Sequence, residues 1–303
     1  MSRDWGPELL DRLKELVKDP PPSLAVEITE AGIAAARIEP KTDLEFVPFK
    51  PGTLVVSPVD ENVVDPDDFA QAVRAVGAMQ AARKRRDVAV ILPDYSARIA
   101  VLDFDSFPSD AKEQLSLIKF RLRRSVPFDV DAAAISYFPQ AAHGKNVDVV
   151  VVLAPHEIVA RYEAPFRAAG MNPGLITTSS LAALELAPDE GLSVLAKISG
   201  RVLTVMVRDK GILKLVRCVE LASAELEDVA GVLVPTFVFV EDNLGSKADR
   251  LLLCGFAAQT DEAQRRFSEE LGAQVEAVRS PLGVPGETNA GLLGYLRSIA
   301  KNN

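Results

Sequence analysis

This 303-residue chain has few residues suited to covalent or metal chemistry. It contains two cysteines, two histidines and one tryptophan. Cys218 and Cys254 lie in apolar, strand-like runs without disulfide or metal-ligand spacing, which indicates buried thiols in a reducing compartment. The sequence has no G-x-x-x-x-G-K-[ST] loop and no G-x-G-x-x-G turn, and neither histidine lies in a nucleophile motif. These absences argue against nucleophilic, metal-dependent and P-loop enzymes.

The chain also has too little positive charge for nucleic acid and no apolar run suited to a membrane. Its 34 Lys and Arg against 43 Asp and Glu give a net charge of −9. The longest charge-free candidate, Val229 to Val240, has 12 residues and includes Pro235, whereas a spanning helix needs about 20. No basic-then-apolar leader begins the chain. We therefore expect a cytoplasmic protein, without nucleic acid or a direct membrane span, that reaches the membrane through a partner.

One pattern of three short strands occurs twice, about 170 positions apart. Each copy has an apolar strand, a tight turn, a second strand, another turn and a third strand, at residues 24–49 and 194–218. Alternating helices and strands follow each copy, and 303 residues suffice for two cores. The pattern predicts a duplicated α/β chain whose two lobes enclose a cleft, where a ligand or partner is expected.

The expected divisions follow from this doubling. An amphipathic helix at 4–18 and a Pro20-Pro21-Pro22 spacer precede the first lobe; the helix packs on its own domain or docks on a neighbouring protein. A small α+β unit is expected as an insertion at about 97–142, with Ser109 as the N-cap of its helix. The chain then divides into an N-terminal segment, a first lobe and a second lobe at residues 1–22, 23–188 and 189–303.

The order of these motifs resembles a known superfamily. A doubled three-strand meander with helices between is similar to the actin, Hsp70 and sugar kinase superfamily, which has a duplicated ribonuclease H-like fold. Three stretches resemble its bacterial PilM-like branch, which belongs to type IV pilus assembly. They are Arg98-Ile99-Ala100-Val101-Leu102 with Val126-Pro127-Phe128, Ala154-Pro155-His156-Glu157 with Ser179-Ser180-Leu181, and Glu241-Asp242-Asn243-Leu244-Gly245 with Leu252-Leu253-Cys254-Gly255.

The resemblance implies a nucleotide site whose residues are degenerate here. Relatives that bind ATP have an Asp-x-Gly turn in each meander and a glycine pair near the adenosine. This chain has Glu27 and Thr29 at the first turn, and Lys197 and Ser199 at the second. Ala34 stands where a basic residue often follows, and Gly255-Phe256 replaces the glycine pair, which implies a ring where adenosine would lie. Thr and Ser add a Cβ where glycine permits close approach.

These departures predict a protein that does not hydrolyse ATP and has no nucleotide or metal cofactor. Lys197 cannot help to coordinate Mg²⁺, although it can contact an anion directly. A further possibility is that Glu27 and Lys197 pair across the cleft, so that an internal ion pair replaces metal and phosphate; such a pair is not necessarily stabilising.

The resemblance then implies a scaffold rather than an enzyme. Its partner would be a bitopic, PilN-like inner-membrane protein whose short cytoplasmic tail docks in a groove beside the inserted unit, and self-association is also possible. The alternatives are a nucleotide-binding ATPase of pilus assembly and an actin-like subunit of a type II secretion platform. Candidate partner-binding residues are Arg98, Arg121, Arg123, Arg124, Pro127 and Phe128. The three arginines of the helix either form a solvated face or meet an acidic tail or lipid headgroups.

Overall fold

The first lobe is built on a five-stranded sheet. A computed structural model describes residues 21–38, 42–79, 86–140, 146–188 and 190–302. The strand order is β3-β2-β1-β4-β8, in which the first three strands form an antiparallel meander and β4 and β8 run parallel to β1. The strands are Leu24–Thr29 (β1), Gly32–Arg37 (β2), Asp43–Pro48 (β3), Asp87–Leu92 (β4) and Asn172–Thr178 (β8).

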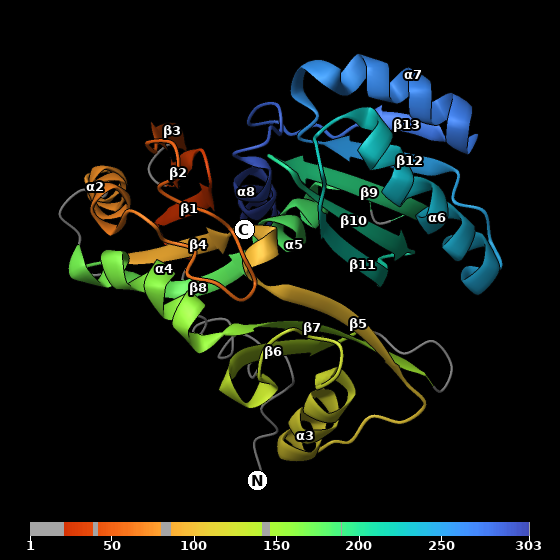
Figure 1. Ribbon diagram of the computed structural model, residues 1–303, viewed down its shortest axis with the longest axis horizontal. Helices are drawn as coiled ribbons and strands as arrows, with labels where there is room; N and C mark the ends of the chain where they lie inside the picture. Colours follow the sequence, from red (N-terminus) through yellow and green to blue (C-terminus); the bar gives the residue numbers. More distant parts are fainter. Residues whose placement is uncertain (1–20, 39–41, 80–85, 141–145, 189, 303) are drawn as a thin grey trace, which may run out of the picture.

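The second lobe repeats this arrangement and confirms the predicted duplication. Its order is β11-β10-β9-β12-β13, again a meander followed by two parallel strands (Figure 1). β1 and β9 are buried along almost their whole length because helices cover both faces of each sheet. The strands are Leu192–Ser199 (β9), Val202–Asp209 (β10), Ile212–Glu220 (β11), Arg250–Cys254 (β12) and Gln274–Ala277 (β13).

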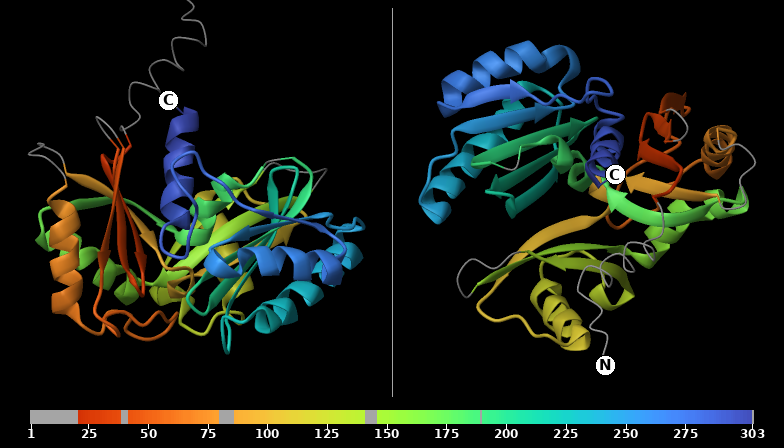
Figure 2. Two further views of the ribbon diagram at one scale, coloured as in Figure 1. Left: turned by 90° about the horizontal axis from the view of Figure 1, so that it is seen from above. Right: turned by 180° about the vertical axis from the view of Figure 1, so that it is seen from behind.

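Six helices complete the two lobes in the part of the chain described. Two pack on the outer face of the first sheet and two on that of the second. The remaining two, α5 and α8, lie between the lobes (Figure 2) and share one core with both sheets. This common core joins the lobes into one folded unit. The helices are α2 (Pro66–Gly77), α4 (His156–Ala168), α5 (Ser179–Ala183), α6 (Leu226–Leu244), α7 (Thr260–Leu271) and α8 (Ala290–Asn302).

A third, smaller sheet forms the inserted subdomain. Its order is β5-β7-β6, and helix α3 covers one face. Because β7 is the central strand, the subdomain continues beyond the predicted end at about residue 142, to Pro155. The elements are Arg98–Phe104 (β5), Ala111–Leu122 (α3), Ala133–Pro139 (β6) and Val147–Pro155 (β7).

The inserted subdomain also contacts the second lobe. β5 lies beside β11 (Figure 1). The Gln140 side chain exchanges two 2.8 Å hydrogen bonds with the backbone of Leu213. Lys214 Nζ lies 2.5 Å from Asp148 Oδ2. The subdomain therefore bridges the two lobes beneath the cleft.

Aspartate side chains cap the N-termini of α2 and α3, and the second of these caps corrects a prediction. Asp65 caps α2, whereas α3 is capped by Asp110, whose carboxylate accepts the Lys112 and Glu113 amides, and not by the predicted Ser109. Short 3₁₀ turns occupy Asp94–Ser96, Val130–Ala132, Leu184–Leu186 and Ala257–Gln259. The predicted helix at 4–18 lies outside the described residues. Among the helices described, none is both long and apolar enough to cross a membrane.

Candidate functional site

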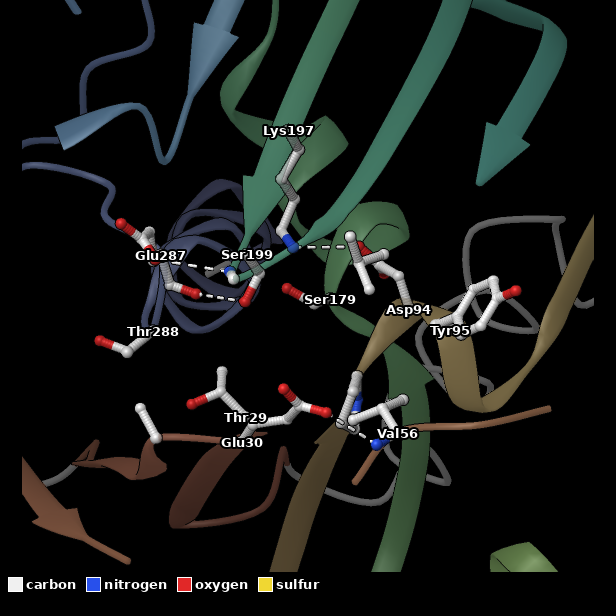
Figure 3. Close-up of a pocket in the computed structure, with 14 residues that line it drawn as sticks. Thr29, Glu30, Val56, Asp94, Tyr95, Ser179, Lys197, Ser199, Glu287 and Thr288 are labelled. Atoms are coloured by element: carbon white, nitrogen blue, oxygen red, sulfur yellow. Dashed lines mark hydrogen bonds and ion pairs between the residues drawn. The ribbon is translucent and has the colours of Figure 1, made fainter. Parts of the chain in front are cut away.

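The two turns that would hold phosphates face each other across a small cavity. It has a volume of about 150 Å³ and lies between the β1–β2 and β9–β10 turns (Figure 3). The hydroxyl group of each turn donates a hydrogen bond to a backbone carbonyl of the protein. Thr29 Oγ1 donates to the Gly32 carbonyl at 3.2 Å, and Ser199 Oγ donates to the Glu287 carbonyl at 2.8 Å. Neither hydroxyl proton is therefore free to donate to an anionic ligand.

Two carboxylates of the protein also line this cavity. Glu30 Oε1 accepts the Val56 amide at 2.8 Å, and Glu287 Oε2 lies 3.4 Å from the Gly200 amide (Figure 3). Gly200 belongs to the second turn, where the resemblance places a phosphate-binding amide. A carboxylate at this amide, with a second on the opposite wall, makes the cavity unfavourable for an anionic ligand.

A buried ion pair joins the lobes at the base of the cavity. Lys197 extends from β9, and its Nζ lies 2.9 Å from Asp94 Oδ2 (Figure 3). Asp94 follows β4 of the first lobe and also accepts the Ser180 amide at 2.6 Å and the Thr204 hydroxyl at 3.1 Å. Both charged side chains are almost fully buried. Asp94 therefore makes hydrogen bonds to groups from both lobes.

Glu27 does not make the direct pair with Lys197 that the sequence suggested. Its Oε1 accepts a short hydrogen bond from Ser179 Oγ, and its Oε2 accepts the Leu292 amide at 2.7 Å. Asp94 instead takes the position beside Lys197. An internal ion pair of Lys197 is present, but its acidic partner is Asp94 and not the predicted Glu27.

Burial and neighbouring charges act in opposite directions on these groups. Burial raises the pKa of Glu27 above its ordinary value of 4.5, although Lys197 and the hydrogen bonds from Ser179 and α8 counteract the rise. Burial alone would lower the pKa of Lys197, but Asp94 and Glu27 together raise it. Lys197 therefore remains a cation.

We expect the difference in unfolding free energy between Glu27→Gln and wild type to depend on pH. A carboxyl with a raised folded-state pKa stabilises the fold below its unfolded pKa, and this stability is lost as pH rises through the folded pKa. Glutamine does not titrate, and its oxygen can accept the Leu292 amide while its NH₂ group donates to Ser179 Oγ, which then accepts instead of donating. As the pH increases from about 4, the unfolding free energy of Glu27→Gln should therefore rise relative to that of wild type. The difference should level off once Glu27 is ionised in the wild-type protein. Urea unfolding of both proteins from pH 4 to 8 measures this; a constant difference would contradict it.

The structure places the remaining nucleotide-site positions in packed surroundings. Ala34 lies opposite Glu27 on β2 and is buried between the lobes. Gly255 has a φ of +83°, and a Cβ there would approach the Ile198 carbonyl oxygen to 2.2 Å, so glycine is required by packing. Phe256 borders a cavity of about 250 Å³, but its side chain is only 4% exposed and packs edge-on against Phe267 in the second-lobe core.

Cys254 is buried, as the sequence indicated, whereas Cys218 is only partly buried. Burial raises the pKa of Cys218 and of Cys254 to about 12, so both remain protonated thiols at neutral pH. Among the described residues no group of His, Cys, Asp and Glu is arranged to hold a metal ion. These thiols carry no chemistry that the cleft could use.

The candidate partner-binding residues lie mainly around α3. Arg121 pairs with Asp103 and covers the Phe104 ring, and Arg123 pairs with Asp131. Arg98 lies over the Tyr95 ring. Phe128 packs against the core beneath α3, while Arg124 and Pro127 are exposed. The structure thus brings five of the six, all except Arg98, to the α3 side of the inserted sheet.

A groove opens on the opposite face of that sheet. Its volume is about 210 Å³, and its walls come from β6 and β7 of the inserted subdomain and from β8 and α4 of the first lobe. None of the six candidate residues lines it. The lining is mainly apolar and includes Leu92, Ala97, Ala134, Ile135, Ser136, Val152, Ala154, Val159, Ile176, Thr177 and Thr178.

Two features make this groove suitable for an extended peptide. Three consecutive residues of β6 and three of β8 line it, so the edges of these strands border it. Both are edge strands, with backbone groups that can pair with an added strand. Thr178 Oγ1 is buried without a hydrogen-bond partner in the described structure, and it provides one polar group in an apolar wall.

The fold is similar to several solved structures. No protein-family model and no curated protein matches the sequence. The PilM–PilN type IV pilus biogenesis complex matches with a TM-score of 0.72 and 18% identity, over 91% of this chain and 98% of the matched chain. This chain has an actin-like fold. The actin-like architecture was thus predicted correctly from the doubled meander and the ordered motifs.

Two further solved structures match over most of their length. One is a protein of unknown function with an actin-like ATPase fold from Bacteroides thetaiotaomicron, at a TM-score of 0.53 and 13% identity, covering 90% of this chain and 94% of that one. The other is the cytoplasmic domain of EpsL, an inner-membrane component of the Vibrio cholerae type II secretion system. It has a TM-score of 0.51 and 14% identity, and the match covers 92% of this chain and 94% of that one.

Proposed function

We propose that this actin-like protein is a non-enzymatic scaffold on the cytoplasmic side of a bacterial type IV pilus inner-membrane platform. Its partner would be a bitopic, PilN-like membrane protein, which would hold it at the membrane periphery. The groove between the inserted subdomain and the first lobe carries this proposal. The similarity in fold to PilM, solved as a complex with PilN, supports the choice of partner.

The contents of the cleft support a role without ATP hydrolysis. Glu287 lies at the amide of the second turn, Glu30 lines the opposite wall, and Lys197 is neutralised by Asp94. A nucleotide would bring further negative charge to two carboxylates and would have to break a buried ion pair to reach the lysine. These groups support the proposal that the cleft holds no nucleotide.

The groove favours an apolar tail bound in an extended conformation. A tail strand can pair with the edge of β6 or β8, while its side chains contact Val152, Val159 and Ile176. A polar group of the tail can bond to Thr178 Oγ1, which otherwise stays buried and unpaired. A short cytoplasmic tail of a bitopic protein has the length and the flexibility that such binding requires.

The test is binding of a fluorescein-labelled peptide with the cytoplasmic tail sequence of the PilN-like protein from the same genome, followed by anisotropy. Val159→Asp, which places a charge in the apolar groove, should weaken binding at least ~10-fold. Thr178→Val should weaken it by up to ~10-fold without lowering the melting temperature, because it also removes an unpaired hydroxyl.

Val284→Asp is the matched control, since Val284 is 84% exposed and does not line the groove. It should bind the tail as wild type does. Failure of the wild-type protein to bind the tail, or equal binding by Val159→Asp and Val284→Asp, would contradict the proposed docking site.

The second candidate is an actin-like subunit of a type II secretion platform, which the similarity in fold to the EpsL cytoplasmic domain favours. The two candidates differ in their partner. We would titrate tail peptides from the pilus protein and from the secretion protein of the same genome in parallel. The peptide that binds more tightly identifies which candidate function is correct.

A further inference from the structure

Strand β3 leaves an apolar surface open at the edge of the first sheet. Leu44 and Phe46 are 41% and 46% exposed. They stand opposite Ala36 and Ala34 of β2, so their side chains share the face of the sheet that packs between the lobes. The two alanines are buried in the core that α8 shares with both sheets, whereas the two larger residues beside them are open to solvent. The apolar surface is thus an uncovered continuation of this core.

Helix α8 covers the neighbouring strands of the same face. It contacts β1 and β2 and lies beside the first meander (Figure 2). On the outer face of the sheet, by contrast, α2 contacts β3 itself. Packed helices lie about 8–10 Å apart, which is about two strand spacings, so one further helix beside α8 would lie over β3. The exposed surface therefore suits a single apolar helix.

The chain itself supplies a segment of matching pattern and length. Residues 4–18, which lie outside the described part of the chain, have the sequence pattern of an amphipathic helix. Trp5, Leu9, Leu13 and Leu16 recur at the spacing of one helix face. A helix over these residues would be about 22 Å long, against about 20 Å for the six residues of β3. The segment can therefore cover the whole strand.

The connection to β1 holds this segment close to the exposed surface. β1 begins at Leu24, which pairs with Arg37 at the end of β2, and Arg37 pairs with Asp43 at the start of β3. The starts of β1 and β3 are therefore two strand spacings, about 10 Å, apart. Residues 19–23 include Pro20-Pro21-Pro22 and, at about 3.1 Å per residue, span up to about 15 Å. The segment can thus reach β3, whereas the exposed apolar side chains of α6 lie beyond the second sheet (Figure 1).

We propose that residues 4–18 dock as a helix on β3 of the same chain, beside α8, and bury Leu44 and Phe46. The end of the segment then lies near the start of β3, so that Leu16 meets Leu44 and Leu13 meets Phe46. Apolar burial drives the contact, and the short connection keeps the local concentration of the segment high. The docked helix also shields an edge strand that is otherwise open to other chains. This contact does not involve the tail groove and is independent of the proposed function.

The single tryptophan of the chain, Trp5, reports on this docking. In the full-length protein Trp5 should emit at short wavelength and be poorly quenched by acrylamide, because the docked segment shields its ring. Phe46→Asp and Leu13→Asp should each shift the docking equilibrium at least ~10-fold toward the free segment, because each would bury an unpaired charge at the contact. Trp5 emission should then move to longer wavelength, and quenching should increase.

Phe120→Asp is the matched control, because Phe120 is a 77% exposed aromatic on α3 of the inserted subdomain. It should leave Trp5 emission unchanged, and melting temperatures verify that all variants fold. The pair Leu13→Cys/Phe46→Cys should form a disulfide within one chain on oxidation, and its failure to form would contradict the placement.

Two results of the fluorescence experiment overturn the proposal. One is a solvent-exposed Trp5 in the wild-type protein, or shielding that Phe46→Asp leaves intact. The other is shielding that increases with protein concentration, since it would assign the surface on β3 to a second copy of the chain.

Discussion

Replacing Lys197 with methionine should lower the free energy of unfolding by about 3–5 kcal/mol. The change leaves Asp94 and Glu27 buried together without their cation, while methionine occupies a similar volume. The loss comes from an uncompensated buried charge rather than from a cavity. Urea unfolding at pH 7 measures it.

The double variant Asp94→Asn/Lys197→Met separates charge from packing. Asparagine keeps an oxygen for the Ser180 amide but carries no charge, so the double variant should lose less stability than Lys197→Met alone. Additive losses from the two single changes would show that the ion pair is not coupled and would contradict the role given to it here.

Gly294→Ala should be severely destabilising, by about 3 kcal/mol or more, although alanine is ordinarily the better helix former. In α8 a Cβ at Gly294 would lie 2.0 Å from the Ala182 carbonyl oxygen, and one at Gly291 would lie 2.8 Å from Ser179 Cα. Both contacts are with the backbone of α5, so no flexible side chain can yield. Thermal and urea unfolding of the variant measure the loss.

Gly231→Ala in α6 is the matched control for this prediction. A Cβ at Gly231 meets nothing within 4 Å. The substitution should stabilise the protein by about 0.5–1 kcal/mol, the ordinary helical preference for alanine. Equal behaviour of the two variants would mean that the close packing of α8 on α5 does not determine how the lobes join.

Local sequence patterns predicted the repeated part of the fold. The strand runs at 24–49 and 194–218 became the two meanders, because apolar residues bounded by tight turns specify paired strands wherever they occur. The extent of the inserted subdomain was harder to predict. The sequence of β7 is typical of a central strand, but it does not indicate which sheet the strand joins.

The contacts at the site depend on distant segments and were harder to predict. Asp94 is 103 residues from Lys197, and only the packing of the two sheets brings them together. Its position directly after a buried strand was the one available signal, because side chains at the ends of parallel strands gather beside a cleft. The groove is likewise assembled from five separate elements, β4, β6, β7, β8 and α4, and no single stretch of sequence contains it.

The most direct test of a cleft occupied by the protein's own groups is calorimetric titration of the purified chain with Mg·ATP, with melting temperatures recorded alongside. We expect no heat beyond dilution and no change in melting temperature, because Glu30 and Glu287 repel the phosphates and Lys197 is already paired with Asp94. Saturable one-to-one binding with a raised melting temperature would contradict this, since a ligand that binds only the folded state must stabilise it.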